Sequence, residues 1–141
     1  MKKLYIFFII VIVILCAFCY LYYNNKVAYS EKKSINSYYE EFKKNEVNGA
    51  EIATLINKIE NDNLSNEVQK DSNGLYLDNG TNSVTVELKF KDSDSTIHGE
   101  KIFNGGTDKF ISLYSNNKFK CDNIEYHDKT KTVRYLHFTE I

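Results

Sequence analysis

The pattern of apolar and polar positions changes abruptly after the first 23 residues of the chain. Every one of the 20 residues in positions 4–23 has an apolar or aromatic side chain. At about 1.5 Å per residue, 20 helical residues span the roughly 30 Å hydrocarbon core of a membrane. Tyr20, Tyr22 and Tyr23 lie at the end of this run, where aromatic side chains mark a membrane interface. The pattern predicts one transmembrane helix in contact with the lipid bilayer.

Two kinds of processing signal would change this interpretation. The small-x-small sequence Ala28-Tyr29-Ser30 resembles a signal-peptide cleavage site, but it lies beyond the apolar run, and the run is longer than a signal-peptide core. Cys16 and Cys19 follow large residues rather than the small residue that precedes a lipidated cysteine. We therefore expect an uncleaved signal anchor, with cleavage after Ser30 left as the alternative.

The lysines on the two sides of the run are nearly balanced. Lys2 and Lys3 precede it directly, whereas Lys26, Lys32 and Lys33 follow it at a greater distance. Because cytoplasmic flanks carry the excess of lysine and arginine, the adjacency of Lys2 and Lys3 favours a cytoplasmic N-terminus. The expected location is the plasma membrane, crossed once, with the C-terminal domain extracytoplasmic.

A helical stalk is predicted next, over residues 24–46. Ile35, Tyr38, Tyr39 and Phe42 recur with the spacing of one helical face, and Glu40, Glu41, Lys43 and Lys44 occupy the other side. This aromatic stripe packs either on its own domain or on another protein. Tyr38, Tyr39 and Phe42 are therefore the candidate residues for contact with a partner, because tyrosine is enriched at protein interfaces.

The clearest local signal is the start of a second helix, predicted over residues 49–60. Asn48 is suited to the N-cap, and Glu51 three residues later completes a capping box. Ile52, Leu55 and two further isoleucines then form one apolar face. The polar sequence 61–63 is expected to end this helix.

The remainder of the chain alternates as strands do, which predicts an α+β domain over residues 47–141 with a small antiparallel sheet and one short helix. A short strand is expected at 75–77, followed by a hairpin turn at Asp78-Asn79-Gly80. The short helix begins near Thr107, and a β-bulge is expected between Cys121 and Ile124. The main strands are predicted at residues 84–90, 118–127 and 132–139.

Composition narrows the classes of function. The formal net charge is −1, and only one of the 18 basic residues, Arg134, is an arginine. A nucleic-acid-binding protein needs a basic face, so nucleic acid is not an expected partner. The only cysteine after the apolar run is Cys121, so the domain cannot form an internal disulfide bond.

Few residues suggest catalysis. The sequence from Asp92 to Thr96 has the D-x-D-x-T pattern of phosphoaspartate phosphatases, but it follows an alternating strand in a domain too small for their fold. As a calcium loop it lacks the required Gly and Glu, since Ile97 and Phe103 occupy those positions. A solvated acidic turn is expected there.

The three histidines and Cys121 do not have the spacing of a metal site. If residues 128–131 form a four-residue loop, His127 pairs with Thr132, and His137 points to the opposite face of the sheet. His137 would then lie near Asp122. No catalytic residue, metal ligand, cofactor or small-molecule substrate is predicted.

Part of the chain has a familiar pattern. Residues 47–58, Phe119-Lys120-Cys121 and Ile124-Glu125-Tyr126-His127 resemble a group of small, uncharacterised, single-span membrane proteins of low-GC Gram-positive bacteria. This resemblance implies a membrane location and no established activity. In its layout alone the chain is similar to type IV pilins and pseudopilins, although it has neither a Gly before the apolar run nor a Glu early within it.

These observations favour a non-enzymatic binding or accessory protein of the cell envelope, with another envelope protein as its partner. One alternative is a pilin-like subunit of a filament or secretion apparatus. A second alternative is a small thiol enzyme that uses Cys121 and a histidine.

Overall fold

The computed structural model describes residues 2–43, 46–93 and 95–141, and it divides the chain into two units. The first unit ends at Ser34, and the second runs from Ile35 to Ile141. This boundary lies inside the segment that the sequence suggested as a stalk. Lys44 and Asp94, which were assigned above to the stalk and to an acidic turn, lie outside the described residues.

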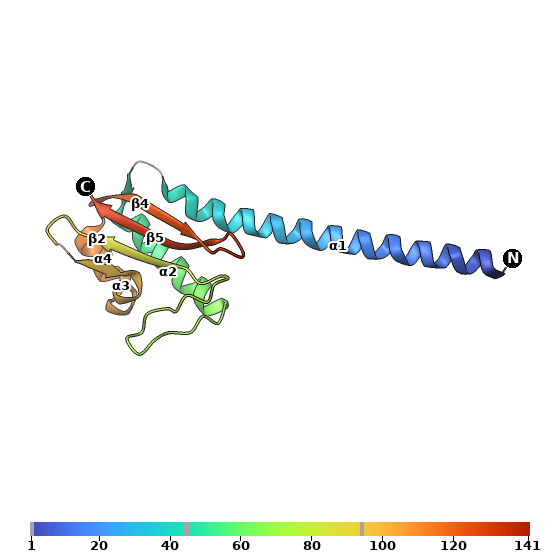
Figure 1. The fold of residues 1–141 in the computed structure, drawn as a ribbon. Helices are drawn as coiled ribbons and strands as arrows, with labels where there is room; N and C mark the ends of the chain where they lie inside the picture. Colours follow the sequence, from blue (N-terminus) through green and yellow to red (C-terminus); the bar gives the residue numbers. More distant parts are fainter. Residues whose placement is uncertain (1, 44–45, 94) are drawn as a thin grey trace. The chain divides into compact units, whose positions relative to one another are not determined.

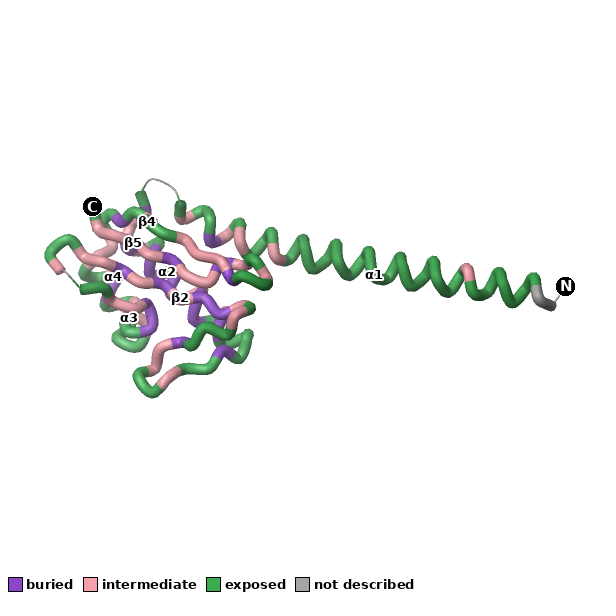
Figure 2. Tube along the Cα trace, in the orientation of Figure 1, coloured by how far each residue is buried: buried purple, intermediate pink, exposed green. Residues whose placement is uncertain are grey.

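Helix α1 (Lys2–Glu40) carries the apolar run, and its residues from Ile35 onward belong to the second unit. It is long and apolar enough to span a membrane, and its most apolar stretch has no buried residue. Figure 2 shows this segment of the helix exposed along almost its whole length. A helix at the core of a globular protein would bury such a face, so its exposure fits a lipid environment.

The second unit is an α+β domain built on a five-stranded sheet (Figure 1). The sheet contains β1 (Val47–Asn48), β2 (Thr85–Lys89), β3 (Thr96–His98), β4 (Lys118–Tyr126) and β5 (Val133–Glu140), in the order β1-β4-β5-β2-β3. A 3-10 turn, η1 (Glu41–Lys43), follows α1, and the helices of the domain are α2 (Gly49–Ser65), α3 (Gly99–Gly105) and α4 (Thr107–Tyr114).

The predicted antiparallel sheet is in fact mixed, because β2 and β5 run parallel. Along the chain, helices α3 and α4 lie between β3 and β4. Strands β4 and β5 then form an antiparallel hairpin, and β5 lies beside β2 in the sheet. The register places Val86 opposite Leu136 and Leu88 opposite Phe138, with all four side chains buried. The parallel pairing therefore joins two apolar faces, although the two strands are distant in sequence.

Helix α2 begins as predicted. The Asn48 side chain accepts a hydrogen bond from the Glu51 N–H at 2.9 Å, and the Glu51 carboxylate accepts one from the Asn48 N–H at 2.8 Å. The predicted end at residues 61–63 is wrong, because the helix continues to Ser65. Asn63 is fully buried there, and its amide exchanges two hydrogen bonds with the backbone of Val84. A polar residue that usually ends a helix is used here to fix the start of β2.

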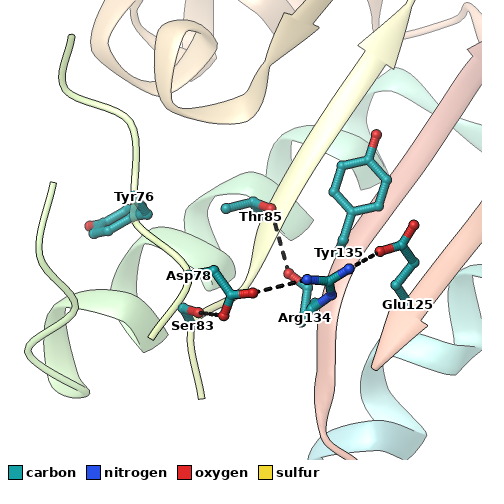
Figure 3. A pocket seen from close by; sticks show the side chains of 7 residues that line it. All are labelled: Tyr76, Asp78, Ser83, Thr85, Glu125, Arg134 and Tyr135. Carbon is teal, nitrogen blue, oxygen red and sulfur yellow. Dashed lines mark hydrogen bonds and ion pairs between the residues drawn. The ribbon is translucent and has the colours of Figure 1, made fainter. Parts of the chain in front are cut away.

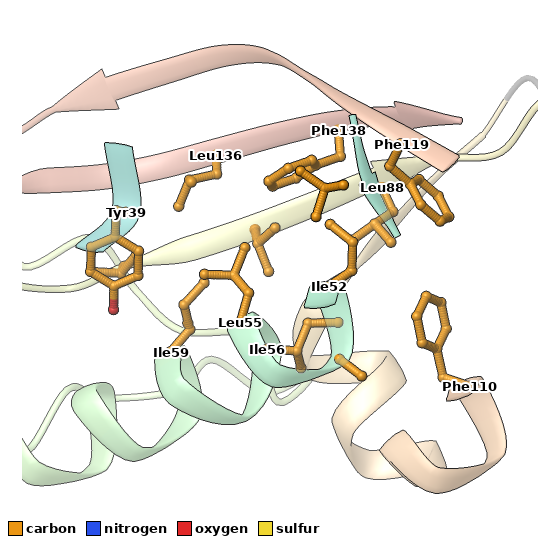
Figure 4. Close-up of a cluster of buried hydrophobic side chains, with 14 of the residues drawn as sticks. Tyr39, Ile52, Leu55, Ile56, Ile59, Leu88, Phe110, Phe119, Leu136 and Phe138 are labelled. Atoms are coloured by element: carbon orange, nitrogen blue, oxygen red, sulfur yellow. The ribbon is translucent and has the colours of Figure 1, made fainter. Parts of the chain in front are cut away.

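The core lies between α2 and one face of the sheet, as Figure 4 shows. Helix α2 contributes Ile52, Leu55, Ile56 and Ile59, which are all at most 4% exposed. Burial of side chains of this size stabilises a fold by about 1.5–3 kcal/mol each. Tyr39 from α1 and Phe110 from α4 close the two ends of this layer.

Other local predictions had mixed outcomes. The three main strands are confirmed, and the register shift between Cys121 and Asn123 confirms the bulge. The short strand at 75–77 is reduced to an isolated bridge between Lys70 and Tyr76, so the hairpin predicted at residues 78–80 is absent and the chain only bends there. Two short helices are present where one was predicted, because α3 is too short to show a helical period in the sequence.

Candidate functional site

The predicted contact residues Tyr38, Tyr39 and Phe42 lie against their own domain. Tyr39 is 1% exposed, and its hydroxyl donates a hydrogen bond of 2.7 Å to Asp62. Burial, together with this hydrogen bond, raises the pKa of Tyr39. The ring of Phe42 packs edge-on against Phe138. The ring of Tyr38 packs edge-on against Tyr39 and Phe42. As a correction, Tyr39 is unavailable to a partner in this structure, whereas Tyr38 and Phe42 remain partly exposed.

Cys121 and His137 lie on opposite faces of the sheet. Cys121 pairs with the buried Phe138, so its side chain is directed towards the core, and the neighbouring His137 is directed away from it. Burial raises the pKa of the Cys121 thiol to about 11, which keeps it protonated at neutral pH. A thiol nucleophile acts as the thiolate, so this geometry supplies no activated cysteine.

The histidines are dispersed. The backbone N–H of His127 donates a hydrogen bond to the backbone carbonyl of Thr132 at 2.9 Å, which confirms the predicted pairing of these residues. His137 Nδ1 lies 3.4 Å from the Asp122 carboxylate, near which it was predicted. His98 Nδ1 lies 3.2 Å from Glu87. In the part of the chain that the structure describes, no group of three or more His, Cys, Asp or Glu residues is arranged to hold a metal ion.

A polar pocket of about 220 Å³ surrounds the single arginine of the chain (Figure 3). Arg134 donates hydrogen bonds to Asp78, at 2.9 Å, and to Glu125. The Gly80 N–H and then the Arg134 guanidinium hold the pKa of Asp78 below its usual range. Both terminal nitrogens of the guanidinium are thus paired with carboxylates of the protein, and the remaining Nε, which has no partner among the described residues, is buried away from an anionic ligand.

Asp78, His127 and Ser83 are the residue types of a hydrolase triad, and the sequence gave no reason to group them. Their connections differ from those of a triad. His127 Nδ1 lies 3.4 Å from Asp78, but Nε2 is 2.8 Å from the backbone carbonyl of Ser83, while the Ser83 hydroxyl donates to Asp78. In a triad the second ring nitrogen takes the serine proton. His127 is also only 2% exposed, so the cluster fastens the loop at residues 78–83 to the β4–β5 turn.

A second buried polar cluster fixes the long connection between α2 and β2. Glu60 is 4% exposed and accepts hydrogen bonds from the Tyr76 hydroxyl and from Lys70, at 2.9 and 2.6 Å. Glu100 accepts one from the Tyr76 N–H at 3.2 Å. Burial alone would lower the pKa of Lys70, but the hydrogen bond to Glu60 and the charge of that carboxylate raise it. The lysine therefore stays protonated, and its ion pair with Glu60 holds the loop in place.

An apolar groove of about 310 Å³ lies between α3, α4 and the β2–β3 hairpin. Its apolar lining consists of Phe90, Ile97, Ile102, Phe110, Leu113 and Tyr114. Lys101 and Lys109 lie at its rim, and Leu113 is 62% exposed. The sequence analysis missed this groove because α3, which forms one of its walls, was not predicted.

The chain was also compared with known protein families, curated proteins and solved structures. No protein-family model, no curated protein and no solved structure matches the chain.

Proposed function

We propose that the protein is a non-enzymatic, membrane-anchored binding protein of the cell envelope. Residues 4–23 would cross the plasma membrane, and the domain that begins near Ile35 would lie on the extracytoplasmic side. The observation that carries the anchor is the apolar segment of α1, which is long enough to span a bilayer and is exposed throughout its most apolar stretch. The lysines Lys2 and Lys3 support the proposed orientation.

The proposed binding role rests on the domain. The polar pocket and the buried polar cluster pair Arg134 and Lys70 with carboxylates of the protein, although Arg134 Nε and Glu100 Oε2 are buried without a hydrogen-bond partner in the described part of the chain. Neither cluster joins a nucleophile to a base. The apolar groove, in contrast, leaves large apolar side chains open to solvent beside two lysines. Surfaces of this kind mark contact sites more often than catalytic ones.

Membrane insertion is tested by fractionation of cells that produce the full chain. We expect the protein to remain in the membrane fraction after a carbonate wash and to be released by detergent. The matched control carries Ile9→Lys and Val13→Lys, because each lysine at the centre of a span costs about 2.5–3.5 kcal/mol. A wild-type protein that washes off with carbonate would contradict the anchor.

Orientation is tested by cysteine labelling. Asn116 is exposed in the domain, so an Asn116→Cys variant whose three natural cysteines are replaced by alanine gives one reporter thiol. An impermeant maleimide should label this thiol in intact cells. Labelling only after lysis would place the domain in the cytoplasm and overturn the proposed side.

The pilin-like alternative is favoured by one observation, the long apolar N-terminal helix that precedes the domain in the sequence. A subunit of this kind would pack through its N-terminal helix. Detergent-extracted protein should then form oligomers that disappear in the Ile9→Lys, Val13→Lys variant. A monomer at all concentrations would remove this alternative.

A further inference from the structure

We propose that the apolar groove binds an acidic amphipathic segment of a partner protein. Large apolar side chains of the segment would enter the groove, and its carboxylates would pair with Lys101 and Lys109. The inference rests on the proposed binding role, and it assigns to that role a place in the fold and a partner chemistry. It does not depend on which side of the membrane the domain occupies.

The floor of the groove is made by the core, and its upper wall is open. Phe110 is 5% exposed and packs with Phe90 at a ring-centroid distance of 6.4 Å. The rings of Tyr114 and Phe90 are tilted by 47° with their centroids 4.8 Å apart, which makes a continuous aromatic surface. Leu113, on the next turn of α4, is 62% exposed. A ligand that covers this surface would remove apolar area from water, at about 25 cal/mol per Å².

The junction of α3 and α4 leaves room for the backbone of a ligand. A Cβ atom added at Gly105 or at Gly106 would meet no heavy atom within 4 Å. At Gly49 and Gly99, in contrast, an added Cβ would clash with Tyr114 and Val86 at 2.0 and 2.4 Å. The two glycines of the groove therefore border open space, and a ligand can approach the main chain closely there.

The positive charges of the two lysines at the rim of the groove favour a partner segment with negative charges. Lys101 and Lys109 are exposed, and neither has a carboxylate within 4.0 Å among the described residues. The neighbouring Glu100 is buried and bonded to the backbone of Tyr76, and the exposed Asp108, also a described residue, forms no ion pair with either lysine. Most lysines of the described domain also lack an ion pair, so the position of Lys101 and Lys109 beside exposed apolar side chains is what distinguishes them. Carboxylates on the ligand would pair with these two lysines.

The groove is shallow and open, but a hollow of about 310 Å³ still receives the side chains of a peptide rather than inserting its own into a lipid surface. Protein elements that enter a bilayer present protruding apolar side chains, whereas grooves of a few hundred Å³ receive the side chains of a ligand. An amphipathic helix that lays its apolar face into a groove is a recurrent mode of peptide recognition. The occupant argued here is accordingly a segment with large apolar residues on one face and Asp or Glu beside them.

The test uses the full-length protein in neutral-lipid nanodiscs as the target for a phage library of random 12-residue peptides. We expect the enriched peptides to combine large apolar residues with Asp or Glu. Synthetic copies should bind with a Kd that rises at least about fivefold in Lys101→Glu, Lys109→Glu, since each exposed ion pair contributes up to about 1 kcal/mol. The charge-matched control Lys118→Glu, Lys120→Glu, on β4, should change the Kd less than twofold.

The apolar part of the groove has its own matched pair. Leu113→Glu places a carboxylate in the groove and should abolish binding of the selected peptides. Leu64→Glu is the control, because Leu64 lies on α2 outside the groove and is 61% exposed, almost the same as Leu113. Both positions are at the surface, so both variants should fold, which circular dichroism and thermal unfolding check.

Three results would overturn the inference. The first is a phage selection in which no enriched peptide loses binding in Leu113→Glu, or in which the enriched peptides lack acidic residues. The second is self-association of the protein that Leu113→Glu abolishes, which would assign the groove to a second copy. The third is recruitment of phosphatidylglycerol vesicles that depends on Lys101 and Lys109, which would assign it to lipid. Membrane fractionation is unaffected by these variants, so failure here is distinguishable from failure of the anchor.

Discussion

Two aromatic clusters of the domain lie in different environments. The first cluster, at the end of α1 and in η1, is Tyr38, Tyr39 and Phe42. The second cluster, at the end of β2 and on α4, is Phe90, Phe110 and Tyr114. The first closes the core over β5, with Tyr39 almost completely buried. The second supports the core with one ring and presents the others to an open groove.

The difference follows from what lies opposite each cluster. Tyr39 closes one end of the core layer and finds a hydrogen-bond acceptor in Asp62 for its hydroxyl. The second cluster includes two rings of α4 itself, and α3 and α4, which have 7 and 8 residues, leave it open on one side. A cluster of aromatic residues therefore does not reveal by itself whether its side chains belong to the core or to a contact surface. That depends on the length of the elements that the fold places above it.

The largest effect is expected at Tyr39. Tyr39→Ala removes a fully buried ring and should lower the free energy of unfolding by about 3–5 kcal/mol. Tyr39→Phe keeps the ring and removes only the hydrogen bond to Asp62, so it should cost about 0.5–1.5 kcal/mol. Urea unfolding of the full chain in detergent measures both values. A loss below 1 kcal/mol for Tyr39→Ala would mean that the first cluster is not part of the core.

A smaller effect is expected from paired glycine substitutions. In Gly49→Ala the new methyl group would lie 2.0 Å from the carbonyl oxygen of Tyr114, a backbone atom that cannot move aside cheaply. Overpacking of this kind costs about 1–3 kcal/mol. Gly105→Ala meets no atom within 4 Å, and should raise stability by up to about 1 kcal/mol because alanine favours the helix. Equal losses in the two variants would show that the groove is closed in solution.

Local signals predicted much of this fold. The capping box at Asn48 and the alternation of Val86 and Leu88 depend on neighbours in sequence, so they were found without a structure. The parallel pairing of β2 with β5 was missed because it is decided by the return path through α3 and α4. The end of α2 was misplaced because Asn63 bonds to Val84, 21 residues away, which no local pattern reveals.

The candidate site was predicted less well. The stripe of Tyr38, Tyr39 and Phe42 was recognised as a surface with two alternatives, and the structure places Tyr39 in the core. The groove could not be predicted, because it exists only where α3 packs on β2. Gly99 permits that close approach, since a Cβ there would lie 2.4 Å from Val86. Gly99 was the only sequence signal for this close contact. A glycine by itself does not distinguish a site of close packing from a turn.

Acid should loosen a third region, the loop at Asp78, without affecting either aromatic cluster. The pKa of Asp78 is lowered by the Gly80 N–H and by Arg134, so its contribution is present above about pH 4 and is lost as the pH falls through the lowered value. Both partners are exposed, which limits this contribution to under about 1 kcal/mol. Between pH 6 and pH 3, Asp78→Asn should therefore lose less stability than the wild type.

Hydrogen exchange locates the acid effect. Amides at residues 78–83 should exchange faster at pH 3 after correction for the intrinsic rate, while those around Tyr39 and Phe110 stay protected. Equal loss of stability in the wild type and in Asp78→Asn would contradict a role for this carboxylate.

The smallest effect on stability is expected at Leu113, and it sharpens the comparison most. Because Leu113 is 62% exposed, Leu113→Ala should change the free energy of unfolding by no more than about 0.5 kcal/mol, as should Leu64→Ala. The two variants should diverge once a groove-binding peptide is present, since a ligand at 100 times its Kd stabilises the folded state by about 2.7 kcal/mol. The peptide should raise the melting temperature of Leu64→Ala as much as that of the wild type, and that of Leu113→Ala less. An equal rise in both variants would mean that the peptide binds outside the groove, and a large loss of stability in Leu113→Ala without peptide would mean that this leucine already belongs to the core.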